Sequence, residues 1–470
     1  MDTRMIVLEF NELTPSLMHR FMSEGKLPHF KRMYEQSDVY TTTASEQPPN
    51  LDPWIQWVTV HTGLNLRDHG LRRLNEGHTL RAPRIWDLMS AYGRRVWVCG
   101  SMNVGLSHPP GGAILPDPWT TNVKPFPGAL QDYFTFVQRQ VMEHTSTRGT
   151  SGLGDAMRFL RFMLSHGLTF KSVRAVISQL LAERRAPVRW KRAALLDELQ
   201  FDVFAWYYRR LRPHFASFFL NSTAHYQHLY WREMDPSAFT VKPSEAEQRA
   251  HQDAIEYGYR RMDHLLSRVF ALAGPRTAIV MATALSQQPC LSFEAHGGKN
   301  FYRPKDWAPV TALAGVTASY TASPVMAHQF HLYFADAVTA QAAADRLTAL
   351  RFRDRQALSV ERNGPGVFVG CRIYEPIPSD ARLSVEGGDR EAPFFDLFYK
   401  VDGVKSGMHH PDGMLWIRGA ARTHAVHPGH VPLATVAPTL LELCDVPRPS
   451  YMWPTVDQWS ERESTARATA

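Results

Sequence analysis

The stretch that decides the fold is Phe215-Ala216-Ser217-Phe218-Phe219-Leu220, a short and nearly continuous apolar run. A strand of a parallel sheet has this character because helices cover both faces of the sheet and bury every side chain. Three further short apolar runs lie beside segments with helical spacing: Met5–Phe10, Arg95–Cys99 and Thr277–Met281. This alternation predicts an α/β protein with a central, mostly parallel sheet, and ligands are expected at the carboxyl ends of its strands.

Two segments interrupt the alternation and predict insertions into the core. Residues 125–212 contain long helical stretches separated by Gly or Pro, with frequent Arg and Lys, and predict a helical insertion. Residues 304–399 predict a small α+β insertion, with a strand over His328–Ala335 and an Ala-rich helix over Ala337–Leu350. The polar, small residues 461–470 predict a flexible tail. The core is then expected to consist of residues 1–124, 213–303 and 400–460.

Length and composition narrow the class of protein. The 470 residues are 44% hydrophobic and 21% charged, which suits one large or two merged globular domains rather than a disordered chain. No apolar run approaches the roughly 18–20 residues that span a bilayer. The first apolar run, Met5–Phe10, is too short for a signal peptide and already contains the acidic Glu9. We therefore expect no membrane span and a cytoplasmic location. The net charge of +7 favours a small anionic partner, and no nucleic acid is expected because no basic stripe accompanies the aromatic residues. The oligomeric state stays open.

Four motifs follow one another along the chain, and each joins an apolar element to a polar or histidine-containing segment. In order they are Ile6–Phe10 with Glu9; Pro48–Gly63 followed by Asp68-His69-Gly70; Phe218–Trp231 with His225 and His228; and Gly407–Leu415 with His409 and His410, followed by Ala434–Leu441. In this order the motifs resemble the alkaline phosphatase superfamily, particularly its type I phosphodiesterase/nucleotide pyrophosphatase branch. The resemblance implies an alkaline-phosphatase-like fold.

The resemblance also implies a metal-dependent site. In the family, two divalent cations held by His and Asp flank the transferred group, and a Ser or Thr at a helix start is the nucleophile. This sequence departs from the pattern: Ala224 and Ala284-Leu285 stand where metal ligands are expected, and Pro53 stands where the nucleophile is expected. Alanine and leucine cannot bind a metal. A degenerate, rebuilt site with one metal ion is therefore expected.

The remaining histidines and carboxylates of the same motifs are the candidate ligands. His228 and His409 match the histidines of the first family metal, and Glu9 stands at the first ligand of the second. His225 lies three residues before His228, where it would share one face of a helical turn, and His410 follows His409. These five residues are predicted to bind a divalent ion, either zinc, manganese or iron. The structural alternatives are satisfied core histidines and, for Glu9, a buried salt bridge.

Four further side chains are candidates for catalysis and substrate binding. Asp52 begins an apparent helix and is the nearest carboxylate to the missing nucleophile, with helix capping as the alternative. Asn11, two residues past Glu9, is a candidate for hydrogen bonding the substrate or for weak ligation. Lys299 and Arg303 follow the degenerate metal segment and are candidates for binding an anionic group, with a solvated loop as the alternative.

These residues predict an enzyme that hydrolyses or transfers a phosphate or related anionic ester, with Asp52 or a water activated by the ion as nucleophile. Two other functions stay open. A catalytically inactive relative would keep the fold as a binding or assembly protein, with its histidines retained for packing. A differently purposed enzyme would use the His/carboxylate set with a redox-capable metal such as iron.

Overall fold

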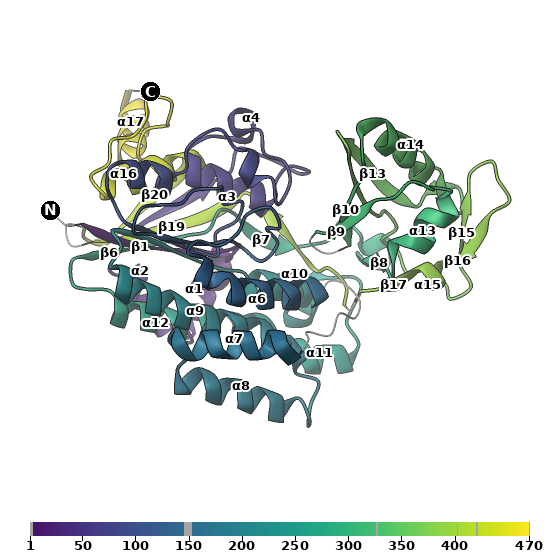
Figure 1. The fold of residues 1–470 in the computed structure, drawn as a ribbon. Coiled ribbons are helices and arrows are strands. Elements are labelled where there is room, and N and C mark those ends of the chain that lie inside the picture. Colours follow the sequence, from purple (N-terminus) through teal and green to yellow (C-terminus); the bar gives the residue numbers. More distant parts are fainter. Residues whose placement is uncertain (1–2, 145–152, 326–327, 402, 420–421, 470) are drawn as a thin grey trace.

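The computed structural model shows a central sheet with helices on both faces (Figure 1). The described residues are 3–144, 153–325, 328–401, 403–419 and 422–469. The eight strands are ordered β20-β2-β19-β6-β1-β5-β3-β4, and β19 alone runs against its neighbours. They are β1 (Arg4–Phe10), β2 (Asp38–Thr43), β3 (Val96–Cys99), β4 (Ala113–Leu115), β5 (Phe215–Leu220), β6 (Thr277–Ala282), β19 (Asp412–Arg418) and β20 (Ala425–Pro432). The mostly parallel α/β sheet predicted from the four apolar runs is confirmed.

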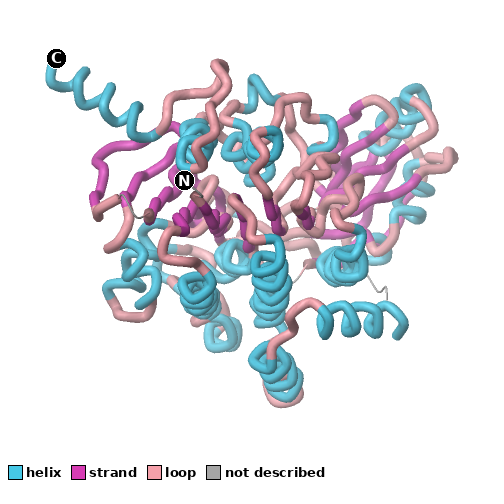
Figure 2. Tube along the Cα trace, turned by 60° about the vertical axis from the view of Figure 1, so that its left-hand side comes forward, coloured by secondary structure: helices cyan, strands magenta, loops and turns pink. Residues whose placement is uncertain are grey.

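Strand β1 lies in the middle of the sheet and is buried on both faces. Ile6, Leu8 and Phe10 face one helical layer, whereas Met5 and Val7 face the other, because side chains alternate along a strand. The first layer contains α1 (Pro15–Ser23), α2 (Pro28–Tyr34), α6 (Gln131–His144), α7 (Leu153–Ser165), α9 (Arg192–Leu211), α10 (Ser222–Met234) and α12 (Ala254–Leu272). The second contains α3 (Pro53–Thr62), α5 (Ile85–Ala91), α16 (Val436–Leu443) and α17 (Val456–Thr469). Figure 2 shows helices on both sides of the row of strands.

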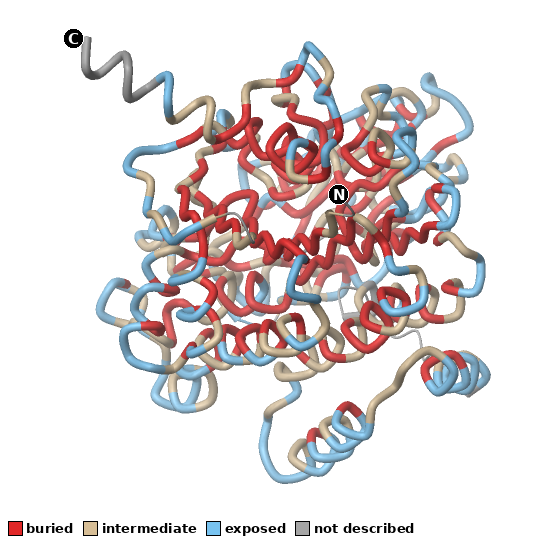
Figure 3. Tube along the Cα trace, turned by 90° about the vertical axis from the view of Figure 1, so that its left-hand side faces the viewer, coloured by how far each residue is buried: buried red, intermediate tan, exposed pale blue. Residues whose placement is uncertain are grey.

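Three helices lie further out. Helix α4 (Leu66–His69) packs on α3, α8 (Phe170–Ala182) packs on α9, and α11 (Glu245–His251) packs on α10. Burial follows this arrangement, since the sheet is buried and the outermost helices are largely exposed (Figure 3). None of the helices in the described part of the chain has both the length and the apolar composition needed to cross a membrane.

The segments predicted as insertions carry the kinds of element expected. Helices α6 to α9 occupy the first, of which residues 145–152 lie outside the described ranges. The second forms a lobe with its own apolar core (Figure 1). Its elements are β8 (Tyr302–Pro304), α13 (Trp307–Ala314), β9 (Thr321–Pro324), β10 (Gln329–Tyr333), α14 (Ala337–Thr348), β11 (Leu350–Phe352), β12 (Arg355–Gln356), β13 (Leu358–Asn363), β14 (Gly366–Cys371), β15 (Arg382–Val385), β16 (Glu391–Pro393), α15 (Phe394–Leu397) and β17 (Phe398–Lys400). Helix α17 runs to Thr469, across the predicted tail; the domain boundaries remain predictions.

Candidate metal centre

Three side chains converge beyond the carboxyl end of the central strand. Glu12 lies in the turn after β1, His228 lies on α10, and His409 lies on β18 (Gly407–His410), which pairs with β7 (Ser286–Pro289). Glu12 Oε2 is 3.0 Å from His228 Nε2 and 3.5 Å from His409 Nε2. One ligand atom from each of these three side chains lies within 4.8 Å of the other two. Among the described residues, this is the group of three or more His, Cys, Asp or Glu side chains that meets this distance.

The three donors fit one divalent cation. His228 Nδ1 lies 3.0 Å from the carbonyl oxygen of Gly407, and Nε2 faces the Glu12 carboxylate. In the tautomer with the proton on Nδ1, the lone pair of Nε2 is available to a cation. Two acceptors at 3.0 Å attract each other only when a proton or a cation lies between them. Burial lowers the pKa of His409 to about 3, which keeps its imidazole neutral, as a ligand must be. Ligand atoms on one tetrahedral zinc ion are about 3.4 Å apart, close to the distances found here.

The Glu12 carboxylate is fixed by its neighbours. Asn11 Nδ2 donates to Oε1 over 2.8 Å, and Gln287 Nε2 donates to Oε2 over 2.6 Å. Burial by itself raises the pKa of Glu12, but electrostatic interactions with the His228 and His409 side chains and the hydrogen bonds to the carboxylate lower this pKa to about 2. The backbone of Glu12 has φ +60°, a conformation that residues other than glycine rarely adopt. A buried, ionised carboxylate in a strained turn is typical of a functional site.

The structure corrects the expected role of Glu9, which lies elsewhere. This residue is still inside β1, so its side chain stands perpendicular to the sheet, on the face that α3 covers. Its Oε1 is 3.1 Å from His61 Nε2, and Ser101 Oγ donates to Oε2 over 2.7 Å. Glu9 therefore forms a buried polar pair, the structural alternative noted for it. The carboxylate beside the histidines belongs to Glu12, which the sequence analysis missed although it lies three residues further, past the end of the strand.

Two of the expected histidine ligands also lie outside the group. His410 follows His409 in β18 and faces the opposite side of the strand, where its Nδ1 accepts a hydrogen bond from the Asp412 backbone over 3.2 Å. On α10, the three-residue spacing leaves His225 exposed while His228 turns toward Glu12. The period of two in a strand was the available signal for separating His409 from His410.

Asn11 and Asp52, the expected catalytic residues, flank the group. Asn11 is buried, and its amide donors and its carbonyl oxygen are engaged within the protein, the carbonyl by the Trp57 indole over 2.8 Å. Its observed contacts hold Glu12 in position. Asp52 precedes α3 and makes no side-chain capping bond, and its Oδ1 lies 3.5 Å from His409 Nδ1. Burial raises the pKa of Asp52 to about 6.

Two lysines lie near Asp52. Lys299 and Lys405 occupy the two segments that join the core to the lobe, and the Lys405 backbone N–H donates to the Lys299 carbonyl over 2.9 Å. Their charges act to lower the pKa of Asp52 against the larger effect of burial. The Lys299 ammonium lies 4.8 Å from the ring centre of Tyr374 and 4.9 Å from that of Phe293. Burial lowers the pKa of Lys299 to about 8. The structure thus places a cationic, aromatic-lined surface beside Asp52.

Arg303, the second expected substrate-binding residue, is buried inside the lobe. It lies on β8 with its guanidinium 4.5 Å from the ring centre of Phe330, and burial lowers its pKa to about 10. In this position the side chain packs in the core of the lobe and not in a solvated loop, which corrects the structural alternative. The role of Arg303 in binding an anionic group stays a prediction.

We expect His328 to make the stability of the fold depend on pH. Burial, reinforced by Lys299, Lys405 and Arg303, lowers the pKa of its imidazole to about 3. An unfolded chain has a histidine pKa near 6.5 and therefore binds more protons between pH 6.5 and 3. The free energy of unfolding is therefore highest above pH 6.5 and decreases as the pH falls from 6.5 toward 3, by up to about 1.4 kcal/mol per pH unit. Acid denaturation followed by circular dichroism should show this slope flattened by His328→Gln. Replacement of the exposed His296 by Gln should leave the slope as in the wild type.

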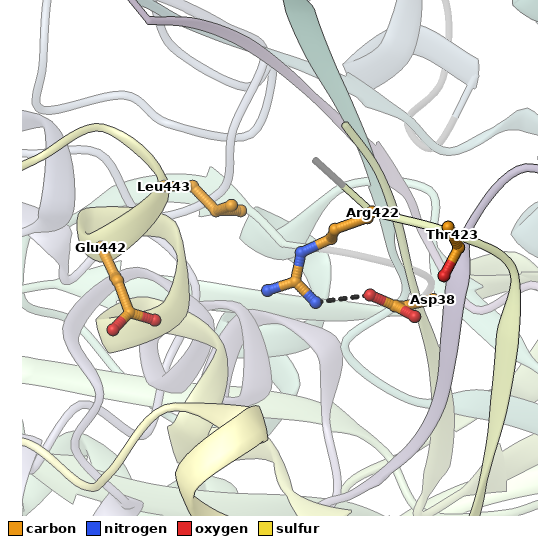
Figure 4. A pocket seen from close by; sticks show the side chains of 5 residues that line it. All are labelled: Asp38, Arg422, Thr423, Glu442 and Leu443. Atoms are coloured by element: carbon orange, nitrogen blue, oxygen red, sulfur yellow. Dashed lines mark hydrogen bonds and ion pairs between the residues drawn. The ribbon is translucent and has the colours of Figure 1, made fainter. Parts of the chain in front are cut away.

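A hollow of about 470 Å³ is lined by none of the three converging side chains. Figure 4 shows it from close by. Its lining residues are Asp38, Arg422, Thr423, Glu442 and Leu443. Arg422 donates to Asp38 Oδ2 over 2.6 Å and to Asp457 Oδ2 over 2.6 Å. Both carboxylates already compensate the charge of the guanidinium, so the side chains of the hollow connect strand β2 to helix α17.

Comparisons with known proteins were made over the whole chain. The solved structures that match include murine ectonucleotide pyrophosphatase/phosphodiesterase 5 in complex with AMP, at 11% identity and a TM-score of 0.41, covering 98% of this chain and 99% of that chain. Phosphonoacetate hydrolase from Sinorhizobium meliloti 1021 in complex with phosphonoformate matches at 14% identity and a TM-score of 0.40, covering 95% of this chain and 96% of that chain. Wild-type alkaline phosphatase PafA matches at 12% identity and a TM-score of 0.46, covering 97% of this chain and 98% of that chain. No family model and no curated protein matches the chain.

Proposed function

We propose that this chain is a metal-dependent hydrolase or transferase that acts on a phosphate or related anionic ester. The observation that carries the proposal is the convergence of Glu12, His228 and His409, three donors whose spacing suits one divalent ion. A divalent ion held there supplies Lewis acidity toward an oxygen of the reacting group.

The residues around the three donors support the same reaction class. Asp52 lies at the N-terminal end of α3 beside His409, where its carboxylate can act as nucleophile or proton acceptor. Its raised pKa of about 6 places the proton equilibrium near neutral pH, as a general base requires. Lys299 and Lys405 offer positive charge to the non-bridging oxygens of an anionic ester.

The same donor set also supports a second candidate function, that of an iron-dependent enzyme. Two histidines and one carboxylate are also the ligands of the facial triad in non-haem iron(II) oxygenases. The two lysines beside Asp52 suit an anionic substrate in either enzyme. The identity of the metal and the reaction therefore have to be measured together.

The decisive experiment is elemental analysis of the protein purified without chelator, with matched histidine variants. His228→Ala and His409→Ala should lose the ion, whereas His225→Ala, on the same helix, and His410→Ala, on the same strand, should retain it. A panel of chromogenic phosphate mono- and diesters then tests the reaction. Zinc, manganese or iron with ester hydrolysis supports the proposal, and iron without hydrolysis supports the second candidate. Absence of metal from the wild type, also after incubation with zinc, manganese or iron(II), would reject both.

A further inference from the structure

Helices α7 and α8 expose apolar side chains in stripes. On α7 the exposed residues recur at positions i, i+3 and i+7, and on α8 at i, i+3, i+7, i+10 and i+11, so each set lies along one face of its helix. They are Met157, Leu160 and Leu164 on α7, and Phe170, Val173, Ile177, Leu180 and Leu181 on α8. Phe170 is 95% exposed and Leu164 is 69% exposed. In Figure 1, α8 is the lowest helix and projects from the body of the protein.

The packing of α8 is the reverse of that of an ordinary surface helix. Its buried residues are the polar Ser172 and Gln179, while all of its large apolar residues except the half-buried Val176 are exposed. Gln179 Nε2 donates to Val188 O over 2.7 Å and to Glu183 Oε1 over 2.9 Å, so the inward face is satisfied by hydrogen bonds. Contact with the rest of the described chain therefore does not account for the apolar stripe. A surface of this kind marks a site of interaction.

The same segment carries a high density of positive charge. Residues 153–192 contain nine Lys and Arg against two acidic residues, a formal charge of +7 that equals the net charge of the whole chain. Both acidic residues are paired with arginine, Asp155 with Arg158 and Glu183 with Arg192. The exposed basic residues that flank the stripes are Arg161, Lys171, Arg174, Arg184, Arg185 and Arg189.

We propose that α7 and α8 form a docking surface for an anionic lipid membrane, on which the protein lies without spanning the bilayer. Apolar side chains flanked by Lys and Arg suit an element that buries one face among the lipids while its cations contact acidic headgroups. A second copy of this chain would bring a like charge of +7 against the first, which disfavours this face as an interface between copies.

Flotation with lipid vesicles tests the proposal. The full chain should bind vesicles of phosphatidylcholine with about one third phosphatidylserine, bind pure phosphatidylcholine at least about 10-fold less, and dissociate as salt rises. The charge variant Arg161→Glu/Lys171→Glu/Arg174→Glu and the apolar variant Leu164→Gln/Phe170→Gln/Ile177→Gln should each weaken binding at least about 10-fold. The matched controls Arg67→Glu/Lys124→Glu/Arg372→Glu and Leu106→Gln/Val338→Gln/Val426→Gln change exposed residues elsewhere and should bind like the wild type.

A second measurement locates the contact even where a variant folds poorly. The four natural cysteines are buried, so a cysteine introduced by Leu164→Cys or Phe170→Cys can be labelled selectively with an environment-sensitive dye. The label should shift to shorter wavelength on anionic vesicles, and the same label at Val338→Cys should not. Equal binding to both vesicle types, controls that lose binding as much as the variants, or no spectral shift would overturn the proposal. Oligomers that the apolar variant abolishes, without vesicle binding, would instead identify a protein interface.

Discussion

Glu12→Gln is expected to remove the bound ion and to lower ester hydrolysis on the order of 100-fold or more. Replacing a residue that hydrogen-bonds a metal ligand reduces metal affinity or activity by about 10–100-fold, and Glu12→Gln replaces a ligand itself. The change keeps the size of the side chain but replaces a carboxylate, held ionised between His228 and His409, with a neutral amide. Metal titration by calorimetry and initial rates on the best ester of the panel measure the two effects.

Glu9→Gln is the matched control, because it makes the same change at a buried carboxylate three residues earlier. Glu9 contacts His61 and Ser101 on the other side of the strand, so this variant should keep its metal content. If Glu12→Gln kept the ion and Glu9→Gln lost it, the assignment of the ligands made here would be wrong.

The fold was predictable from the sequence because burial on both faces leaves a local trace. Strands such as Phe215–Leu220 and Thr277–Ala282 show nearly continuous apolar runs, and every residue of both strands is buried. The lobe and the helical insertion were similarly visible as changes in periodicity. Each of these features depends on residues that are close together in the sequence.

The site was predictable only in part, because ligation depends on the direction of single side chains. His228 and His409 lie together beside Glu12, as the sequence led us to expect, but His225 and His410 were grouped with them and lie outside this group. Alternation along a strand separates adjacent residues and would have corrected His410. Glu12 lies in a turn with a positive φ, and no pattern in the sequence predicts that conformation for a glutamate.

Glu9→Ala is expected to destabilise the protein by about 3–5 kcal/mol, the cost of removing one partner from a buried ionic or hydrogen-bonded pair. Glu9 and His61 are each about 1% exposed, and the deletion leaves His61 Nε2 without its partner and the Ser101 hydroxyl with Ser217 alone. Ser101→Ala removes the hydroxyl that bonds Glu9 and Ser217 but leaves the pair of Glu9 with His61, and should cost about 1–2 kcal/mol. Chemical denaturation followed by tryptophan fluorescence suits this measurement, since the His61 ring lies 4.7 Å from that of Trp86 and 5.7 Å from that of Trp57.

The double variant Glu9→Ala/His61→Ala separates a structural role of Glu9 from a role in the site. Because the two side chains share one buried interaction, the double change should cost less than the sum of the single changes, by about 0.5–3 kcal/mol. Additive losses would show that Glu9 and His61 act independently. The folded fraction of Glu9→Ala should still bind one ion through Glu12, His228 and His409, since none of these three side chains contacts Glu9. If a folded Glu9→Ala protein lost the ion, Glu9 would have to be counted among the ligands, and the proposed set of Glu12, His228 and His409 would be wrong.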